Sequence, residues 1–244
     1  VRDRAEADEV AAHYLEGIAK VRTLGLRCEP SVKLTQLGLD MDRGLALAHA
    51  IGLARAAHEA GSYLWVDMEQ STYVDLTLDL VRRLREESPD VGVCLQAYLV
   101  RTPEDLADML ERGIGVRLVK GAYKEPAAVA YPQKSDVDGH YFTLAERMLA
   151  ARAHARPGRA VFGTHDIRLI ARIREHGGAS GVVAAAYEFH MLYGIHRSEQ
   201  LRLARDGAAV RVLIAYGSYW FPWYMRRLAE RPANVWFVVK SLGG

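Results

Sequence analysis

A lysine and an aspartate lie in two strand-like runs of the sequence. In the run 32–34 the alternation of a strand places Lys33 on the opposite face from its apolar neighbours. In the run 64–69 the same alternation places Asp67 on one face with Trp65. An ammonium and a carboxylate at the ends of adjacent strands would pair, and such a pair can position a substrate beside a reacting centre. A structural ion pair would explain these two residues equally well, so both interpretations stay open.

The next candidate residues favour an anionic ligand. Gln96 lies near the end of the following strand-like run, while Arg117 and Lys120 lie in the run 116–122 with Gly121 near its exit. Two cations and a glycine, which lets the backbone approach closely, suit an anion. A solvated rim would explain Lys120 equally well. It explains Arg117 less well, because Arg117 lies between apolar residues.

Thr164, His165 and Asp166 follow a strand-like run and precede a helical one. Backbone N–H groups at the start of a helix favour a phosphate at this position. A helix cap by Asp166 explains the same residues, and both interpretations can hold together. His165 by itself is weak support for a site.

Arg226 and Arg227 are adjacent in a helical pattern near the end of the sequence. Neighbouring helix residues point about 100° apart, so both guanidinium groups can converge only on a group beside or above the helix end. Planar guanidinium groups suit a carboxylate, and the aromatic run 219–224 could form an apolar wall around it. An ordinary surface pair is the commoner explanation of two adjacent arginines.

Short β-rich runs alternate with amphipathic ones, which indicates parallel strands joined by right-handed helical crossovers. We expect strands near 31–36, 63–69, 91–98, 116–122, 160–165, 182–189 and 209–216. We expect helices near 2–20, 42–60, 72–87, 103–112, 136–154, 167–176, 198–206 and 222–230. Asp42 is expected to cap the second helix, which Gly61 follows. Thr102 is expected to cap the fourth helix, which Gly113 follows.

The architecture expected from this pattern is one α/β barrel domain over residues 1–244. No GxGxxG or GxxxxGK[ST] phosphate loop is present, which weakens the case for an open doubly wound sheet. Polar residues recur at the carboxyl ends of the strands, as in a barrel whose loops share one site. The eighth strand is either the run 235–239 or a first strand upstream of Val1. We favour the second, because residues 1–20 resemble the helix that would follow it; the strands at 31–36 and 209–216 would then have unpaired edges.

Composition excludes several classes of protein. The chain has 244 residues, 50% of them hydrophobic and 25% charged, which suits one large globular domain. Its net charge of +2, with the basic residues spread along the chain, argues against a nucleic-acid partner. The two cysteines, Cys28 and Cys94, fit a reducing, cytoplasmic compartment. No run is long and apolar enough for a membrane-spanning helix, no signal peptide opens the chain, and no metal-ligand spacing is present.

Taken together, the motifs resemble the proline dehydrogenase family, of the short bacterial monofunctional kind. The resemblance runs from Ser31 to Leu242, and most of its motifs stand in the family's order. They are SVKLTQLGLD, WVDMEQS, VCLQAYLVRT, VRLVKGAYKEP, FGTHD, YEFHMLYGI and YMRRLAERPANV. The resemblance implies a distorted (β/α)8 barrel that holds FAD without a Rossmann fold, with the last helix across the barrel mouth.

The resemblance also implies roles for individual residues. Arg226 and Arg227 would hold the carboxylate of L-proline, with Lys33 beside the substrate and paired with Asp67. The substrate side would also include Leu213, and Asp67 and Arg117 would be the catalytic pair. The FAD contacts would come from Gln96 and Arg117 at the isoalloxazine ring, from Lys120, Gly121 and Ala122 at the ribityl and phosphate region, from Thr164 and His165 at the diphosphate, and from Met68.

The implied reaction is hydride transfer from the ring carbon next to the proline nitrogen to flavin N5, which gives Δ1-pyrroline-5-carboxylate. Electrons would then pass to a membrane quinone, which implies a peripheral contact with the inner face of the cell membrane. Pyrroline-5-carboxylate dehydrogenase would be the partner in the pathway.

Several positions depart from the family pattern. Leu213 stands where the family usually has a tyrosine near substrate and flavin, and Trp223 replaces a second aromatic residue, usually tyrosine. His190 stands where the family has glutamine. Gln70 stands where an acidic residue often follows the Met-Glu pair in the family. An alternative is therefore a flavin-binding member of the family with an altered substrate or lost turnover.

Overall fold

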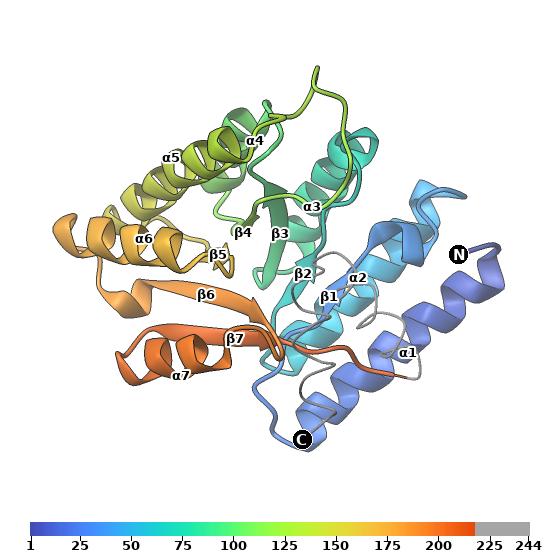
Figure 1. Cartoon of the computed structure of the whole chain (residues 1–244). Coiled ribbons are helices and arrows are strands. Elements are labelled where there is room, and N and C mark those ends of the chain that lie inside the picture. The colour runs from blue at the N-terminus through green and yellow to red at the C-terminus, as the bar shows by residue number, and fades with distance from the viewer. Residues whose placement is uncertain (218–244) are drawn as a thin grey trace, which may run out of the picture.

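The computed structural model describes residues 1–217, in which seven parallel strands form one curled sheet. Each strand pairs with the next one along the chain, in the order β1 to β7 (Figure 1). The strands are β1 (Ser31–Val32), β2 (Leu64–Val66), β3 (Val91–Gln96), β4 (Gly115–Val119), β5 (Ala160–Gly163), β6 (Tyr187–Leu192) and β7 (Ala209–Leu213). The parallel order confirms the α/β class, and the described residues form a half-barrel. The complete (β/α)8 closure is not seen within them.

Seven α-helices flank these strands and pack on the outer side of the curled sheet (Figure 1). They are α1 (Arg4–Thr23), α2 (Arg43–Glu59), α3 (Val74–Glu87), α4 (Thr102–Glu111), α5 (Lys134–Ala153), α6 (Ile167–Ala179) and α7 (Arg197–Arg205). Short 3-10 helices cover η1 (Leu34–Leu37), η2 (Ser71–Tyr73) and η3 (Ala184–Ala186). Each of the seven helices expected within residues 1–217 is present, and the eighth, near 222–230, lies outside the described residues.

Two of the three expected helix caps are confirmed. Asp42 accepts hydrogen bonds from the first backbone N–H groups of α2, and Asp166 does the same for α6. The expectation for Thr102 is wrong. Its hydroxyl donates to the backbone oxygen of Gln96 at 2.6 Å, because Thr102 is already the first residue of α4. The side chain therefore holds the helix against the end of β3.

Several expected strand boundaries are also wrong, two of them by four residues or more. The strand expected at 31–36 ends after two residues, because the chain turns into η1, which Gly38 ends in a left-handed conformation (φ 101°). The strand expected at 182–189 begins only at Tyr187, since residues 184–186 form η3. Leu34 and Leu37 of η1 are buried, whereas η3 has no buried residue.

The two faces of the sheet differ in chemistry. The outward side chains of the strands and the inner sides of the helices form one continuous apolar core. The concave face instead carries Trp65, Arg117 and His190, with the guanidinium carbon of Arg117 5.0 Å from the centre of the Trp65 ring. Strand alternation therefore separates a dry outer layer from a polar interior.

Four charged side chains line the concave face near the amino ends of the strands, and we call them the floor network. Arg159 contacts Glu29 at 2.9 Å and Glu188 at 2.6 Å. Arg211 contacts the same two carboxylates at 2.8 and 3.0 Å. The network joins the segment before β1 to β7. Within residues 1–217, β1 pairs only with β2 and β7 only with β6, as expected for unpaired edges.

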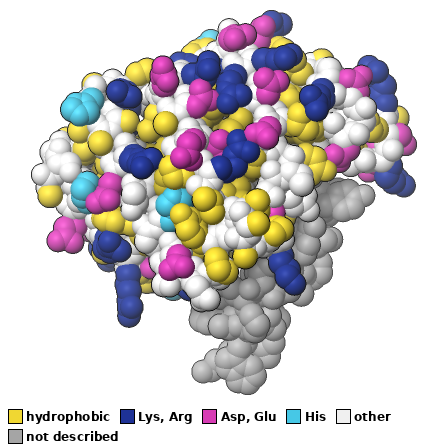
Figure 2. All heavy atoms as spheres, turned by 90° about the horizontal axis from the view of Figure 1, so that it is seen from above, with side chains coloured by type: hydrophobic (Ala, Val, Ile, Leu, Met, Phe, Trp, Pro, Cys, Tyr) yellow, Lys and Arg dark blue, Asp and Glu magenta, His cyan; other side chains and the backbone are white. Residues whose placement is uncertain are grey.

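The surface is mixed in charge. On the face shown in Figure 2, lysine and arginine side chains alternate with aspartate and glutamate side chains. No helix among the described residues is long and apolar enough to cross a lipid bilayer. The run 235–239, an alternative for the eighth strand, lies outside the described residues.

Candidate active site

Asp67 is the centre of a charged cluster at the carboxyl ends of the first strands. It follows β2, and its Oδ2 atom accepts from the Nζ atom of Lys33, which follows β1, at 2.6 Å. Its Oδ1 atom accepts from Nη2 of Arg117 on β4, also at 2.6 Å. The expected pair of Lys33 and Asp67 is therefore present, and Arg117 joins it. Three strands converge on one carboxylate because parallel strands end at the same edge of the sheet.

The electrostatics keep this cluster ionised. Burial opposes the charge on Asp67, but the charges of Lys33 and Arg117 outweigh burial and hold the pKa of the carboxyl well below its ordinary value. Burial lowers the pKa of Lys33, and the neighbouring Asp67 more than compensates, so that its pKa is raised. At neutral pH the site therefore contains two cations around one anion. Asp67 stays a carboxylate and can orient charged groups, but it does not exchange protons near neutrality.

Sequence reasoning missed two further members of the cluster. The Oγ atom of Ser31 donates to Oδ1 of Asp67 at 2.7 Å and accepts from Arg117 at 2.7 Å. The Sγ atom of Cys94 accepts from Nε of Arg117 at 2.8 Å. Ser31 and Cys94 share the inward face of their strands with Lys33 and Gln96. Strand alternation could have shown this, but neither side chain has the chemistry that marks a site by itself.

Gln96 ends β3 on the same face and tests whether the site suits the FAD that the resemblance implies. Its side chain is 3% exposed. Its Oε1 atom has no hydrogen-bond partner among the described residues. A buried acceptor without a donor is costly, and a bound ligand with an N–H group would satisfy it. The N–H of a flavin pyrimidine ring is such a donor, so Gln96 and the neighbouring Arg117 fit the ring.

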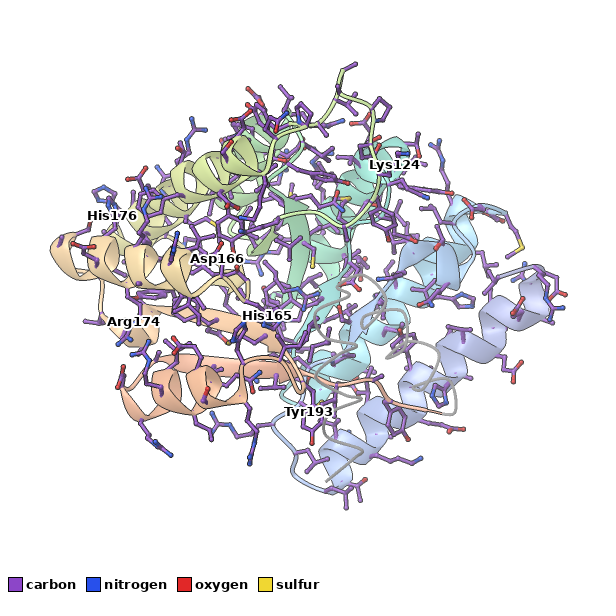
Figure 3. All side chains as sticks on the ribbon, in the orientation of Figure 1. Lys124, His165, Asp166, Arg174, His176 and Tyr193 are labelled. Atoms are coloured by element: carbon purple, nitrogen blue, oxygen red, sulfur yellow. The ribbon has the colours of Figure 1, made fainter. Side chains whose placement is uncertain are left out.

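A second polar group lies at the ends of β4 and β5. Lys120 contacts Asp166 at 2.8 Å and also Asp138, and its side chain is 24% exposed, so carboxylates of the protein neutralise this lysine. Thr164 accepts from the backbone N–H of Asp166 at 3.1 Å. The Nε2 atom of His165 accepts from the backbone N–H of Leu192 at 3.1 Å. Figure 3 shows His165 and Asp166 at the junction between β5 and α6.

The loop after β4 approaches β3 closely. Gly121 has a φ of 118°, and a Cβ atom at this position would lie 2.3 Å from the ring of Tyr98. Only glycine fits this backbone, and the group that approaches it among the described residues is the ring of Tyr98. Ala122, the next residue, is exposed.

The remaining expected site residues are not all in one place. Met68 is 6% exposed and belongs to the apolar core. Leu213 ends β7 and is 38% exposed. Arg226, Arg227 and Trp223 lie outside the described residues. No group of three or more His, Cys, Asp or Glu side chains in residues 1–217 is arranged to hold a metal ion.

His190 and Tyr14 also lie near the cluster. The ring of His190 meets that of Trp65 edge-on, with 5.7 Å between the ring centres, and burial lowers the pKa of His190. The hydroxyl of Tyr14 on α1 donates to the backbone oxygen of Ser31 at 3.1 Å. Nothing in the periodicity of α1 marks Tyr14, because this contact depends on how α1 packs against β1.

Comparisons with known proteins identify the family. The sequence model of the family described as proline dehydrogenase matches residues 1–240. The chain is 38% identical to proline dehydrogenase 1 of Bacillus subtilis over 237 residues, which cover 97% of the chain and 77% of the relative. It is 38% identical to the proline dehydrogenase of Deinococcus radiodurans over 243 residues, covering 98% and 77%.

A solved structure shares the fold. Proline utilization A (PutA) from Bdellovibrio bacteriovorus, inactivated by N-propargylglycine, aligns with a TM-score of 0.77 at 23% identity. The alignment covers 86% of this chain and 26% of that one. The curled sheet of parallel strands is thus the fold of a known protein, while the sequence relatives identify the family. The chain belongs to the proline dehydrogenase family of oxidoreductases.

Proposed function

We propose that the chain oxidises L-proline to Δ1-pyrroline-5-carboxylate with FAD as the hydride acceptor. The observation that carries this proposal is the cluster of Lys33, Asp67 and Arg117, which lies beside the buried acceptor of Gln96. An ionised cluster at the carboxyl ends of barrel-type strands can hold a small charged substrate next to a bound ring.

The residues on the cofactor side divide by chemistry. When bound, FAD supplies a ring that accepts a hydride at N5. Gln96 would accept a hydrogen bond from the ring, and the charge of Arg117 would stabilise negative charge that develops there. The remaining contacts that we assign to FAD are those of Met68, Lys120, Gly121, Ala122, Thr164 and His165.

The residues on the substrate side fix orientation. We assign the carboxylate of proline to Arg226 and Arg227, and the flank of the ring to Lys33 and Leu213. Asp67 keeps Lys33 in place through the contact at 2.6 Å. Holding the reacting carbon against the acceptor supplies much of the rate in a reaction of this kind.

Electrons would leave the enzyme for a quinone, which requires contact with a membrane surface. The product is an imine carboxylate, and an enzyme that oxidises it further, a pyrroline-5-carboxylate dehydrogenase, would be the pathway partner. Both assignments belong to this proposal.

A spectrum tests the proposed function. Protein purified or reconstituted with FAD is expected to be yellow and to lose its absorbance near 450 nm, roughly the band of any oxidised flavin, when L-proline is added without oxygen. D-Proline serves as the control, since a site built for one stereoisomer holds the other in the wrong orientation. An oxidised spectrum that persists in excess L-proline, with FAD bound, would refute the proposal.

The leucine at position 213, where the family usually has a tyrosine, supports a second candidate, a flavin-binding family member with an altered substrate or lost turnover. In the same experiment L-proline would then perturb the spectrum without bleaching it. Hydroxyproline or pipecolate would bleach it if the substrate has changed. Reduction restored by Leu213→Tyr would trace lost turnover to this position.

A further inference from the structure

The side chains of Ser31 and Cys94 link Asp67 to Arg117, the two residues that we assign as catalytic. Ser31 on β1 and Cys94 on β3 flank the strand that carries Asp67. Each contacts both Asp67 and Arg117 (the Oγ atom of Ser31 at 2.7 Å from each). For Cys94 the distances are 2.8 Å from Sγ to Nε of Arg117 and 3.4 Å from Sγ to Oδ1 of Asp67.

Both side chains make the same kind of link. Each accepts a hydrogen bond from the guanidinium group and donates one to the carboxylate. Only a group with both a donor and an acceptor can do this, and hydroxyl and thiol groups have both. Burial raises the pKa of the Cys94 thiol to about 11, although Arg117 opposes the change. The thiol therefore keeps its proton at neutral pH, and with it the ability to donate.

These contacts fix the guanidinium group of Arg117 on two of its three nitrogens. Nε is held by Cys94, and Nη2 by Ser31 and Asp67. Among the described residues, no hydrogen bond of Arg117 engages Nη1, and the side chain is 8% exposed. The arrangement thus holds Nε and Nη2 of the guanidinium group inside the cluster.

We propose that Ser31 and Cys94 are positioning residues that hold Arg117 in one orientation, with Nη1 available to the bound flavin. The flavin part of this statement rests on the proposed function, whereas the fixed orientation of Arg117 does not. The competing explanation is that the two side chains only fill space between strands. The two explanations separate because alanine keeps most of the packing of these small side chains and removes both hydrogen bonds.

The first test needs neither substrate nor cofactor. In 15N-labelled protein, the Nε–H signal of Arg117 is assigned by its absence from Arg117→Lys, and its exchange with solvent is measured. Cys94→Ala is expected to speed this exchange about tenfold or more, the effect of losing a hydrogen bond to a charged group. Cys94→Ser keeps a donor and an acceptor and should retain most of the protection. Cys28→Ala, a change at the exposed cysteine, is the matched control.

The second test uses the FAD-loaded protein. In the double variant Ser31→Ala/Cys94→Ala, kcat for proline is expected to fall about tenfold or more, while KM changes by less than about twofold, because the substrate carboxylate is bound elsewhere. The midpoint potential of the flavin should fall, because the positive charge of Arg117 is no longer fixed beside the ring. Cys94→Ser should restore most of both values when it replaces Cys94→Ala in the double variant.

The exchange measurement and the measurement on the FAD-loaded protein decide different parts of the proposal. Unchanged Nε–H exchange in folded Cys94→Ala would overturn the proposal even in an active enzyme. If proline never reduces the flavin, the proposed function fails, but the exchange measurement still decides on the orientation of Arg117. If circular dichroism shows that the alanine variants do not fold, Cys94→Ser decides: retained protection supports the proposal, and lost protection in a folded protein overturns it.

Discussion

At the scale of single residues, the ion pairs of the cluster all depend on one carboxylate, that of Asp67. Asp67 compensates the charge of Arg117, which is 8% exposed, and of Lys33. The same charges keep its pKa well below the ordinary value, so Asp67 stays ionised throughout the physiological range. The cluster is therefore a fixed set of charges, and its catalytic value lies in orientation and electrostatics.

Removing the carboxylate should destabilise the whole protein. Asp67→Ala leaves a buried guanidinium group without its counterion, and we expect the free energy of unfolding to fall by about 3 kcal/mol. Urea unfolding followed by circular dichroism measures this change. Asp75→Ala is the matched control, because Asp75 is 82% exposed and its contact with Arg101 contributes less than about 1 kcal/mol. Equal losses in the two variants would contradict this account of the cluster.

At the scale of elements, the loop after β4 has a shape that only one residue permits. Gly121 combines a positive φ with the close approach of the Tyr98 ring. The loop begins directly after Lys120, whose Nζ contacts Asp138 on α5 and Asp166 before α6. The backbone conformation at Gly121 thus determines the direction of the loop after β4.

Gly121→Ala is expected to lower the midpoint of thermal unfolding clearly more than Gly61→Ala. Gly61 has a φ of 62°, in the left-handed region that alanine occupies at a cost of about 1 kcal/mol, whereas the φ of 118° at Gly121 lies outside that region and strains alanine further. Only at position 121 does the added Cβ atom meet a ring, because nothing lies within 4 Å of a Cβ at position 61. Differential scanning calorimetry gives both midpoints. If the two variants melt together, the contact with Tyr98 is unimportant.

Sequence patterns predicted the elements better than their ends. Periodicity located all seven strands of residues 1–217, and side-chain chemistry identified Lys33, Asp67 and Arg117. The sequence pattern did not predict the role of Thr102, because the residue that caps a helix depends on the hydrogen bonds that the preceding loop can form. The partners of Lys120 were also missed, since two helix starts distant in sequence supply them. Such contacts follow from three-dimensional packing, which local propensity does not encode.

At the scale of the whole molecule, the floor network is a source of pH-dependent stability. Burial opposes ionisation of Glu188, but the contact with His190 and the charge and hydrogen bonds of Arg159 and Arg211 outweigh it and lower its pKa from 4.5 to about 2. Because the pKa of Glu188 is lower in the folded state than in the unfolded state, its ionisation stabilises the folded state at pH values above the pKa of the unfolded state. That contribution, about 3 kcal/mol, is lost as the pH falls from about 5 to about 2.

Glu188→Gln should therefore be less stable than the parent protein at pH 7, and the difference should shrink as the pH approaches 3. The free energy of unfolding in urea, measured at both values, checks this. Asp79→Asn is the control, since Asp79 lies on the surface of α3 with 53% of its side chain exposed. A difference between parent and Glu188→Gln that stays constant with pH would show that the floor network does not titrate as described.

The floor network and the cluster around Asp67 also differ in when a growing chain can complete them. Ser31, Lys33, Asp67, Cys94 and Arg117 all lie in the first four strands or directly after them, so this cluster can assemble before β5, β6 and β7 have been synthesised. The floor network waits for Arg211 on the seventh strand, and its contact with Glu29 joins segments distant in sequence. Domains fold from the amino terminus during synthesis. The cluster around Asp67 can thus form early, whereas the floor network is completed only when β7 is present.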